Sequence, residues 1–137
     1  MSEKGVNEVE EFISTKPTDK NILVLDDSEF MLDYINETLR FFYTIHLART
    51  PLAAFGMLHK APVDLALLDI AMPGMNGLEF FEHAKKEIYY QNTKTIFITS
   101  SADSENVRKA LLLGADGYIL KPFEASALLA KVKEVLG

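Results

Sequence analysis

The sequence lacks several features that mark particular classes of protein. It contains no cysteine, which excludes disulfides, thiolate catalysis and cysteine-ligated metal sites. No apolar run is long enough to span a bilayer, and the amino-terminal residues are acidic and polar, unlike a secretory signal. The formal net charge of −6 argues against nonspecific binding to nucleic acid. We therefore expect a cytoplasmic chain that contacts neither a membrane nor DNA directly.

The composition that is present favours one globular domain with a core of its own. The chain has 137 residues, of which 48% are hydrophobic and 25% are charged. Residues 1–20 read as an amino-terminal extension or linker, either a disordered terminus or a short amphipathic helix. Residues 21–137 then form the folded domain.

The most informative stretch runs from Val63 to Gly77. It begins as an apolar run that is too short for a typical helix, which is typical of a strand buried on both faces of a parallel sheet. The run ends on one carboxylate, Asp69, and the breaker pairs Pro73-Gly74 and Asn76-Gly77 follow. A strand is therefore predicted to carry an acid to its carboxyl end, which is the edge where α/β sheets bind ligands.

The rest of the chain alternates between strands and helices. Ser28 is a predicted helix cap, and Thr50 followed by Pro51 marks the start of another helix. Such alternation predicts an α/β fold with a parallel sheet and helices on both faces. The expected strands are 21–25, 42–47, 63–69, 95–99 and 117–120, and the expected helices are 29–40, a short helix from 51, 78–88, 103–113 and 125–136.

Polar side chains stand at the carboxyl ends of four expected strands. The first strand ends in Asp26-Asp27, the third in Asp69, the fourth in Thr99 and the fifth in Lys121. If the second strand is the outer one, these groups converge on one pocket. Three neighbouring carboxylates repel one another unless a cation joins them, and Mg²⁺ suits such oxygen ligands. Carboxylates are also known nucleophiles toward phosphoryl groups, so we predict that Asp69 is a phosphoacceptor.

Four motifs resemble those of the response-regulator receiver domain, the phosphoacceptor module of two-component signalling. They are VLDDS at 24–28, LLDIAMPGMNG at 67–77, FITSSA at 97–102 and GYILKPF at 117–123, and the resemblance covers residues 21–136. It implies a doubly wound, flavodoxin-like fold with five helices and the strand order 2-1-3-4-5.

The resemblance assigns the phosphorylation and metal sites residue by residue. Asp69 matches the phosphorylated aspartate, and Asp27 matches the direct Mg²⁺ ligand. Asp26 matches the acid that holds the metal through water, and the backbone carbonyl of Ala71 matches the third protein ligand. Ala71 and Ser101 are small, and we expect them to leave water access to the phosphoaspartate and shorten its lifetime.

The same resemblance assigns the switch. Thr99 matches the hydroxyl that moves toward the phosphoryl group, Lys121 matches the lysine that binds it, and Tyr118 matches the aromatic that follows. The bond between Lys121 and Pro122 is cis in the family. Tyr118 could instead be an ordinary half-buried aromatic.

The implied partners are a sensor histidine kinase or a histidine phosphotransfer protein as donor, and a downstream target protein. The expected activity is that of a stand-alone signalling switch, which promotes only its own phosphorylation and dephosphorylation, rather than an enzyme. A relay intermediate is an alternative. Phe30 and Leu32 lie beside the predicted core stripe of the first helix, so they either pack locally or form an exposed partner patch.

Three other classes remain as alternatives. An aspartate-nucleophile phosphatase would have a second acid at position 71, which is alanine here. A phosphorylation-independent interaction domain would not need the complete set of acids, hydroxyl and lysine. A flavin-binding module would place a phosphate against the first loop, which is acidic at Asp26-Asp27.

Overall fold

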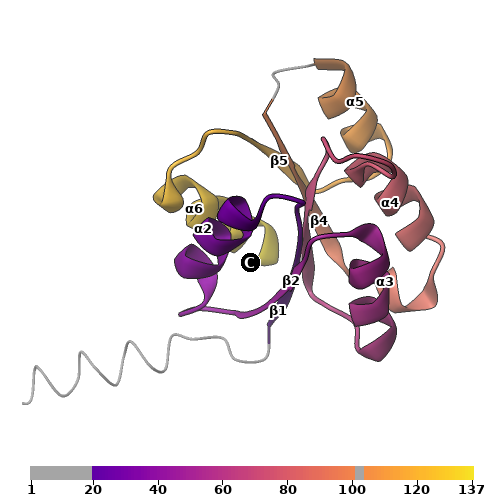
Figure 1. Ribbon diagram of the computed structural model, residues 1–137, viewed down its shortest axis with the longest axis horizontal. Coiled ribbons are helices and arrows are strands. Elements are labelled where there is room, and N and C mark those ends of the chain that lie inside the picture. Colours follow the sequence, from indigo (N-terminus) through magenta and orange to yellow (C-terminus); the bar gives the residue numbers. More distant parts are fainter. Residues whose placement is uncertain (1–19, 101–103) are drawn as a thin grey trace, which may run out of the picture.

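The computed structural model describes residues 20–100 and 104–137, and these form a three-layer α/β domain (Figure 1). All strand pairings in the sheet are parallel, and the strand order is β2-β1-β3-β4-β5. The predicted fold class and order 2-1-3-4-5 are therefore confirmed. The strands are β1 (Asn21–Leu25), β2 (Thr44–Ala48), β3 (Leu65–Asp69), β4 (Lys94–Thr99) and β5 (Gly117–Leu120).

Helices cover both faces of the sheet and divide the core into two layers. The described helices are α2 (Glu29–Leu39), α3 (Pro51–Lys60), α4 (Gly77–Ala84), α5 (Ser104–Leu112) and α6 (Ala125–Leu136). Figure 1 shows α2 and α6 on one face, and α3, α4 and α5 on the other. Because side chains alternate along a strand, Leu23 and Leu25 of β1 enter the layer under α3 and α4, whereas Ile22 and Val24 enter the layer under α2 and α6.

The two predicted helix starts that carry a capping residue, at Ser28 and at Thr50, are confirmed. The Ser28 hydroxyl accepts a hydrogen bond from Met31 N at 3.2 Å, and the Thr50 hydroxyl accepts one from Ala53 N at 3.1 Å. Both bonds satisfy backbone N–H groups that have no partner within the first helical turn.

Several predicted boundaries are wrong, including the start of the third strand, which lies at Leu65 rather than Val63. The helix expected at 78–88 ends at Ala84, because the backbone becomes extended at Glu87 and a short 3₁₀ turn follows, η1 (Ile88–Tyr90). Ile88, which the pattern placed on the helix, is 89% exposed. The second strand begins at Thr44 rather than at Phe42, because the preceding residues still bond back to the Leu39 carbonyl at the end of α2.

The predicted position of Leu32 is also wrong. Leu32 is only 4% exposed and belongs to the core beside Ile35 and Leu39, which lie three and seven residues further along α2. The apolar arc of this helix is therefore wider than the predicted stripe. Phe30 is 77% exposed, so the proposed pair does not form one exposed patch.

The carboxyl end of α5 is held by two sets of hydrogen bonds. Gly114 has a φ of +101°, which glycine adopts without steric cost, and its N–H bonds to Leu111 O while Ala115 N bonds to Ala110 O. The Lys85 ammonium, at the end of α4, donates to the Leu113 carbonyl. This end of α5 is thus tied to the neighbouring helix.

In the part of the chain that the structure describes, no helix is long and apolar enough to cross a membrane. The predicted extension at 1–20 lies outside the described residues except for Lys20, and Ser101 lies outside them as well.

Candidate functional site

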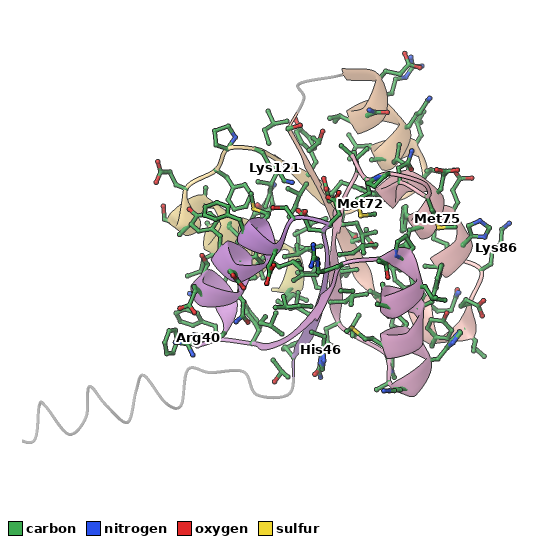
Figure 2. The ribbon with its side chains drawn as sticks, in the orientation of Figure 1. Arg40, His46, Met72, Met75, Lys86 and Lys121 are labelled. Carbon is green, nitrogen blue, oxygen red and sulfur yellow. The ribbon has the colours of Figure 1, made fainter. Side chains whose placement is uncertain are left out.

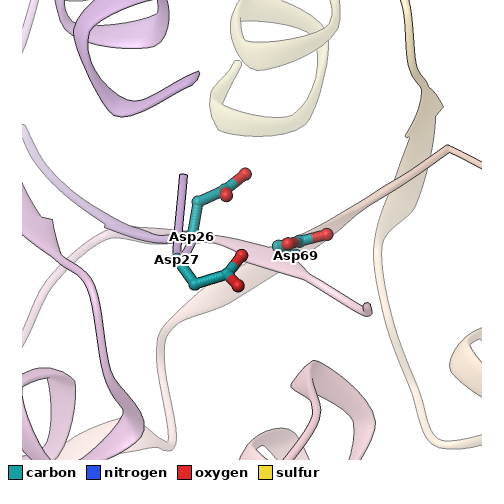
Figure 3. Close-up of side chains that lie close together, drawn as sticks. All are labelled: Asp26, Asp27 and Asp69. Carbon is teal, nitrogen blue, oxygen red and sulfur yellow. The ribbon is translucent and has the colours of Figure 1, made fainter. Parts of the chain in front are cut away.

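Three aspartates meet at the carboxyl ends of two neighbouring strands. Asp26 and Asp27 follow β1, and Asp69 ends β3, which pairs with β1 through Leu25 and Leu68. One carboxylate oxygen from each aspartate lies within 4.8 Å of the other two, and Figure 3 shows the three side chains lying close together. Asp26 is 1% exposed and Asp69 is 3% exposed, whereas Asp27 is open to solvent. The structure therefore brings the predicted acids together.

Lys121 supplies a positive charge to this cluster. Its ammonium lies 3.0 Å from Asp26 Oδ2 and 3.5 Å from Asp69 Oδ1. The lysine follows β5 at the same end of the sheet as Met72 (Figure 2), and its peptide bond to Pro122 is cis, as the resemblance implied. One ammonium faces three carboxylates, so the site carries excess negative charge that a divalent cation would balance.

The electrostatics of Asp69 reflect that excess. Burial, and then the charge of Asp26, raise the pKa of Asp69 to about 6. The Lys121 ammonium and the N–H of Ala71, which lies 3.3 Å from Asp69 Oδ1, act in the opposite direction. Oxygen ligands, buried charge and solvent access at Asp27 together fit a hard cation such as Mg²⁺, which keeps several waters. The donor set therefore fits the predicted metal.

Thr99 and Tyr118 occupy two different environments near this cluster. Thr99 ends β4, is 3% exposed, and its carbonyl accepts a hydrogen bond of 2.7 Å from Lys121 N. The next residue along the chain, Ser100, also carries a hydroxyl, but it is exposed. Tyr118 lies on the edge strand β5 and is 39% exposed, so it is not part of the acid cluster itself.

Gly77 is a residue whose role sequence reasoning missed. It begins α4, and a Cβ atom at this position would collide with the backbone carbonyl of Asp69. Its N–H bonds to Ile70 O at 3.2 Å, and Asn76 and Glu79 form a capping box around it. The Asn76-Gly77 pair predicted only a turn, but the absence of a side chain at Gly77 is what lets the start of α4 pack directly against the end of β3.

The parallel sheet, the buried acids at its carboxyl edge and the adjoining lysine define a receiver-type phosphoacceptor fold. A family profile described as the response regulator receiver domain matches residues 22–133. The chain belongs to this family, whose general role is to accept a phosphoryl group in two-component signalling.

Proteins that are similar in sequence or in structure agree with that assignment. The chemotaxis protein CheY of Halobacterium salinarum is 34% identical over 118 residues, which cover 85% of this chain and 97% of CheY. A CheY-like receiver domain from Methanospirillum hungatei is 37% identical, with a TM-score of 0.79 over 85% of this chain and 93% of that one. The Vibrio cholerae protein CheY4 is 28% identical, with a TM-score of 0.80 over 86% of this chain and 99% of that one.

Other relatives are longer. A probable cyclic di-GMP phosphodiesterase of Vibrio cholerae is 33% identical over 81% of this chain, but the match spans only 25% of that protein. The chain also spans about half of the Helicobacter pylori transcriptional regulator CrdR, at 33% identity. Receiver domains thus occur both alone and joined to other domains among these relatives.

Proposed function

We propose that Asp69 accepts a phosphoryl group from a phosphohistidine, carried by a sensor histidine kinase or a histidine phosphotransfer protein. The observation that carries this proposal is the Lys121 ammonium, which contacts both buried acids, Asp26 and Asp69, beside the open carboxylate of Asp27. Residues 21–137 form the receiver in this proposal, and residues 1–20 are an extension.

The reaction is a direct transfer to a side-chain oxygen. A carboxylate oxygen of Asp69 attacks the phosphorus atom, the bond between phosphorus and the donor imidazole nitrogen breaks, and the imidazole leaves. Asp26, Asp27, Asp69 and the Ala71 carbonyl would hold Mg²⁺, which neutralises charge on the phosphoryl oxygens when bound. Lys121 binds one phosphoryl oxygen with its ammonium, exchanging its contact with Asp69 for one with the new group.

The proposed output is a shift between two conformations of the surface next to the site. Thr99 moves toward the phosphoryl oxygens and Tyr118 follows, which changes the surface formed by α5, β5 and α6. Support comes from the edge strand β5, where Tyr118 and Leu120 are 39% and 41% exposed and can contact a target protein. The domain acts here as a signalling switch rather than as an enzyme on an external substrate.

The test is intact-mass analysis after incubation with acetyl phosphate, with and without Mg²⁺. Wild type and Asp33→Ala, which removes an exposed aspartate from α2, are expected to gain one labile phosphoryl group only with Mg²⁺. Asp69→Ala is expected to gain none. A folded, Mg²⁺-binding wild type that gains no group from either acetyl phosphate or a phosphohistidine donor would overturn the proposal in favour of an interaction domain.

A further inference from the structure

A second cation stands at the rim of the acid cluster. Arg49 follows β2, and its Nη2 atom donates to the backbone carbonyl of Asp27 across 3.4 Å. Its side chain is 61% exposed. A pocket of about 500 Å³ opens beside it, lined by Asp27, Arg49, Thr50, Pro51, Met72 and Pro73.

The charge of Arg49 is only weakly neutralised by its neighbour. Its Nη1 atom lies 3.9 Å from Glu29 Oε2, and the Glu29 side chain is 76% exposed. An ion pair so long and so open to solvent contributes little. Lys121, by contrast, is 17% exposed and lies in direct contact with two cluster carboxylates. Arg49 therefore presents its charge to whatever enters the pocket beside Asp27.

We propose that the positive charge of Arg49 attracts an anionic phosphodonor to the acid cluster and at the same time weakens the binding of Mg²⁺ there. This inference rests on the proposed function. Its distinctive feature is that one charge has two effects of opposite sign, because the metal is a cation and the donor phosphoryl group is an anion.

Arg49 takes no part in the covalent step. With acetyl phosphate, an Asp69 oxygen attacks phosphorus, the bond from phosphorus to the acyl oxygen breaks, and acetate leaves with the bonding electrons. A cation within about 10 Å of a divalent ion or a dianion in a solvated site changes its affinity by about two- to fivefold. Salt screens both effects, so both are expected to fade together as ionic strength rises.

The test compares Arg49→Gln, which removes the charge, with Arg49→Lys, which keeps it. Arg40→Gln is the matched control, since Arg40 is an exposed arginine paired with Glu37 at 3.5 Å near the far end of α2. Calorimetry measures the Mg²⁺ dissociation constant without donor. Intact-mass kinetics then measure phosphorylation by subsaturating acetyl phosphate at saturating Mg²⁺, at low and at high salt.

Arg49→Gln is expected to bind Mg²⁺ about two- to fivefold more tightly and to phosphorylate about two- to fivefold more slowly at low salt. Arg49→Lys and Arg40→Gln are expected to match wild type in both measurements. The inference is overturned if Arg49→Gln behaves like Arg40→Gln, or if metal affinity and phosphorylation rate change in the same direction, which would indicate a purely structural role. If wild type itself is not phosphorylated, the proposed function fails, and the calorimetric result alone overturns or supports the effect of Arg49 on the metal.

Discussion

The buried polar groups at the two ends of the sheet differ in how well their charges and hydrogen bonds are matched. At the carboxyl end, Asp26 and Asp69 are buried together and share one ammonium. At the amino end, the Tyr90 and Thr95 hydroxyls bond to each other at 2.7 Å, and Thr95 N donates to Asp116 Oδ2 at 2.8 Å. One end is closed by well-matched hydrogen bonds, and the other keeps an unbalanced charge. The contrast suggests that stability is concentrated at the amino end and chemistry at the carboxyl end.

The largest expected effect tests how closely the start of α4 packs against the carboxyl end of β3. Gly77→Ala is expected to lower the free energy of unfolding by about 3 kcal/mol, because the new Cβ collides with the Asp69 backbone. It should also slow phosphorylation, since Asp69 must shift. Gly56→Ala is the matched control, because a Cβ in mid-helix at that position meets nothing within 4 Å. We expect that control to be stabilised by about 0.5–1 kcal/mol.

Urea unfolding of both variants, together with acetyl phosphate labelling, measures these effects. Equal stabilities for the two glycine variants would contradict the close packing of α4 on β3.

The second prediction concerns the cost of burying the Asp69 carboxylate beside the negative charge of Asp26. The pKa of Asp69 is raised from 3.8 to about 6 in the folded protein. The folded state therefore binds more protons than the unfolded state between these pH values, so the metal-free wild type loses stability as pH rises through this window. Asp69→Asn removes this buried negative charge. The variant is therefore expected to be more stable than the metal-free wild type by about 2–3 kcal/mol at neutral pH, and by much less near pH 4.

Urea titrations across this pH range, without metal and with Mg²⁺, measure the difference. Mg²⁺ should reduce the difference in unfolding free energy between Asp69→Asn and wild type, because the metal stabilises the wild type. The exposed-site variant Asp33→Asn is expected to follow wild type throughout. If the difference in unfolding free energy between Asp69→Asn and wild type did not depend on pH, the pKa of Asp69 would not be raised by its surroundings.

The amino end supplies the third prediction. Thr95→Val leaves the Tyr90 hydroxyl buried without its 2.7 Å partner and is expected to lower the free energy of unfolding by about 1–2 kcal/mol. Adding Tyr90→Phe should recover part of that loss, because both polar partners are then absent. Calorimetry on the same variants should find unchanged Mg²⁺ affinity. A change in metal affinity would mean that the two ends are coupled.

The smallest expected effect concerns the access of water to the proposed phosphorylation site at Asp69. Ala71 is exposed, has a small side chain and lies two residues after Asp69. Ala71→Leu is expected to slow loss of the phosphoryl group about threefold, less than 1 kcal/mol in the barrier, because a larger side chain hinders the attacking water. The decay of the phosphorylated mass after donor removal measures this, with Ala53→Leu on α3 as the control. An unchanged decay rate would contradict the water-access explanation.

Sequence patterns predicted the architecture well where burial determines the pattern. The strand from Leu65 to Asp69 is buried throughout, so its apolar run ending in an acid was unambiguous. The convergence of Asp69 with Lys121 followed from the rule that parallel strands end at one edge. Helix ends were less predictable, since Ile88 lies at helical spacing from Phe81 although the helix has already ended at Ala84.

Tertiary contacts account for what the patterns missed. The need for glycine at position 77 arises from the Asp69 backbone, eight residues away in sequence, and no local signal reports that collision. The contact of Arg49 with the Asp27 carbonyl joins the ends of β2 and β1, so it was visible only once the strand order had placed them together.

The closure of α5 at its carboxyl end has a mechanical consequence. Because Lys85 donates to the Leu113 carbonyl and Gly114 fixes the turn, we expect that end of the helix to act as a fulcrum. The helix has 9 residues and so is about 13 Å long. A tilt of about 10° around the fulcrum would move the opposite end by about 2 Å. That opposite end begins at Ser104, five positions after Thr99 in the sequence, so we expect a movement of the proposed switch to act on the long arm of this lever.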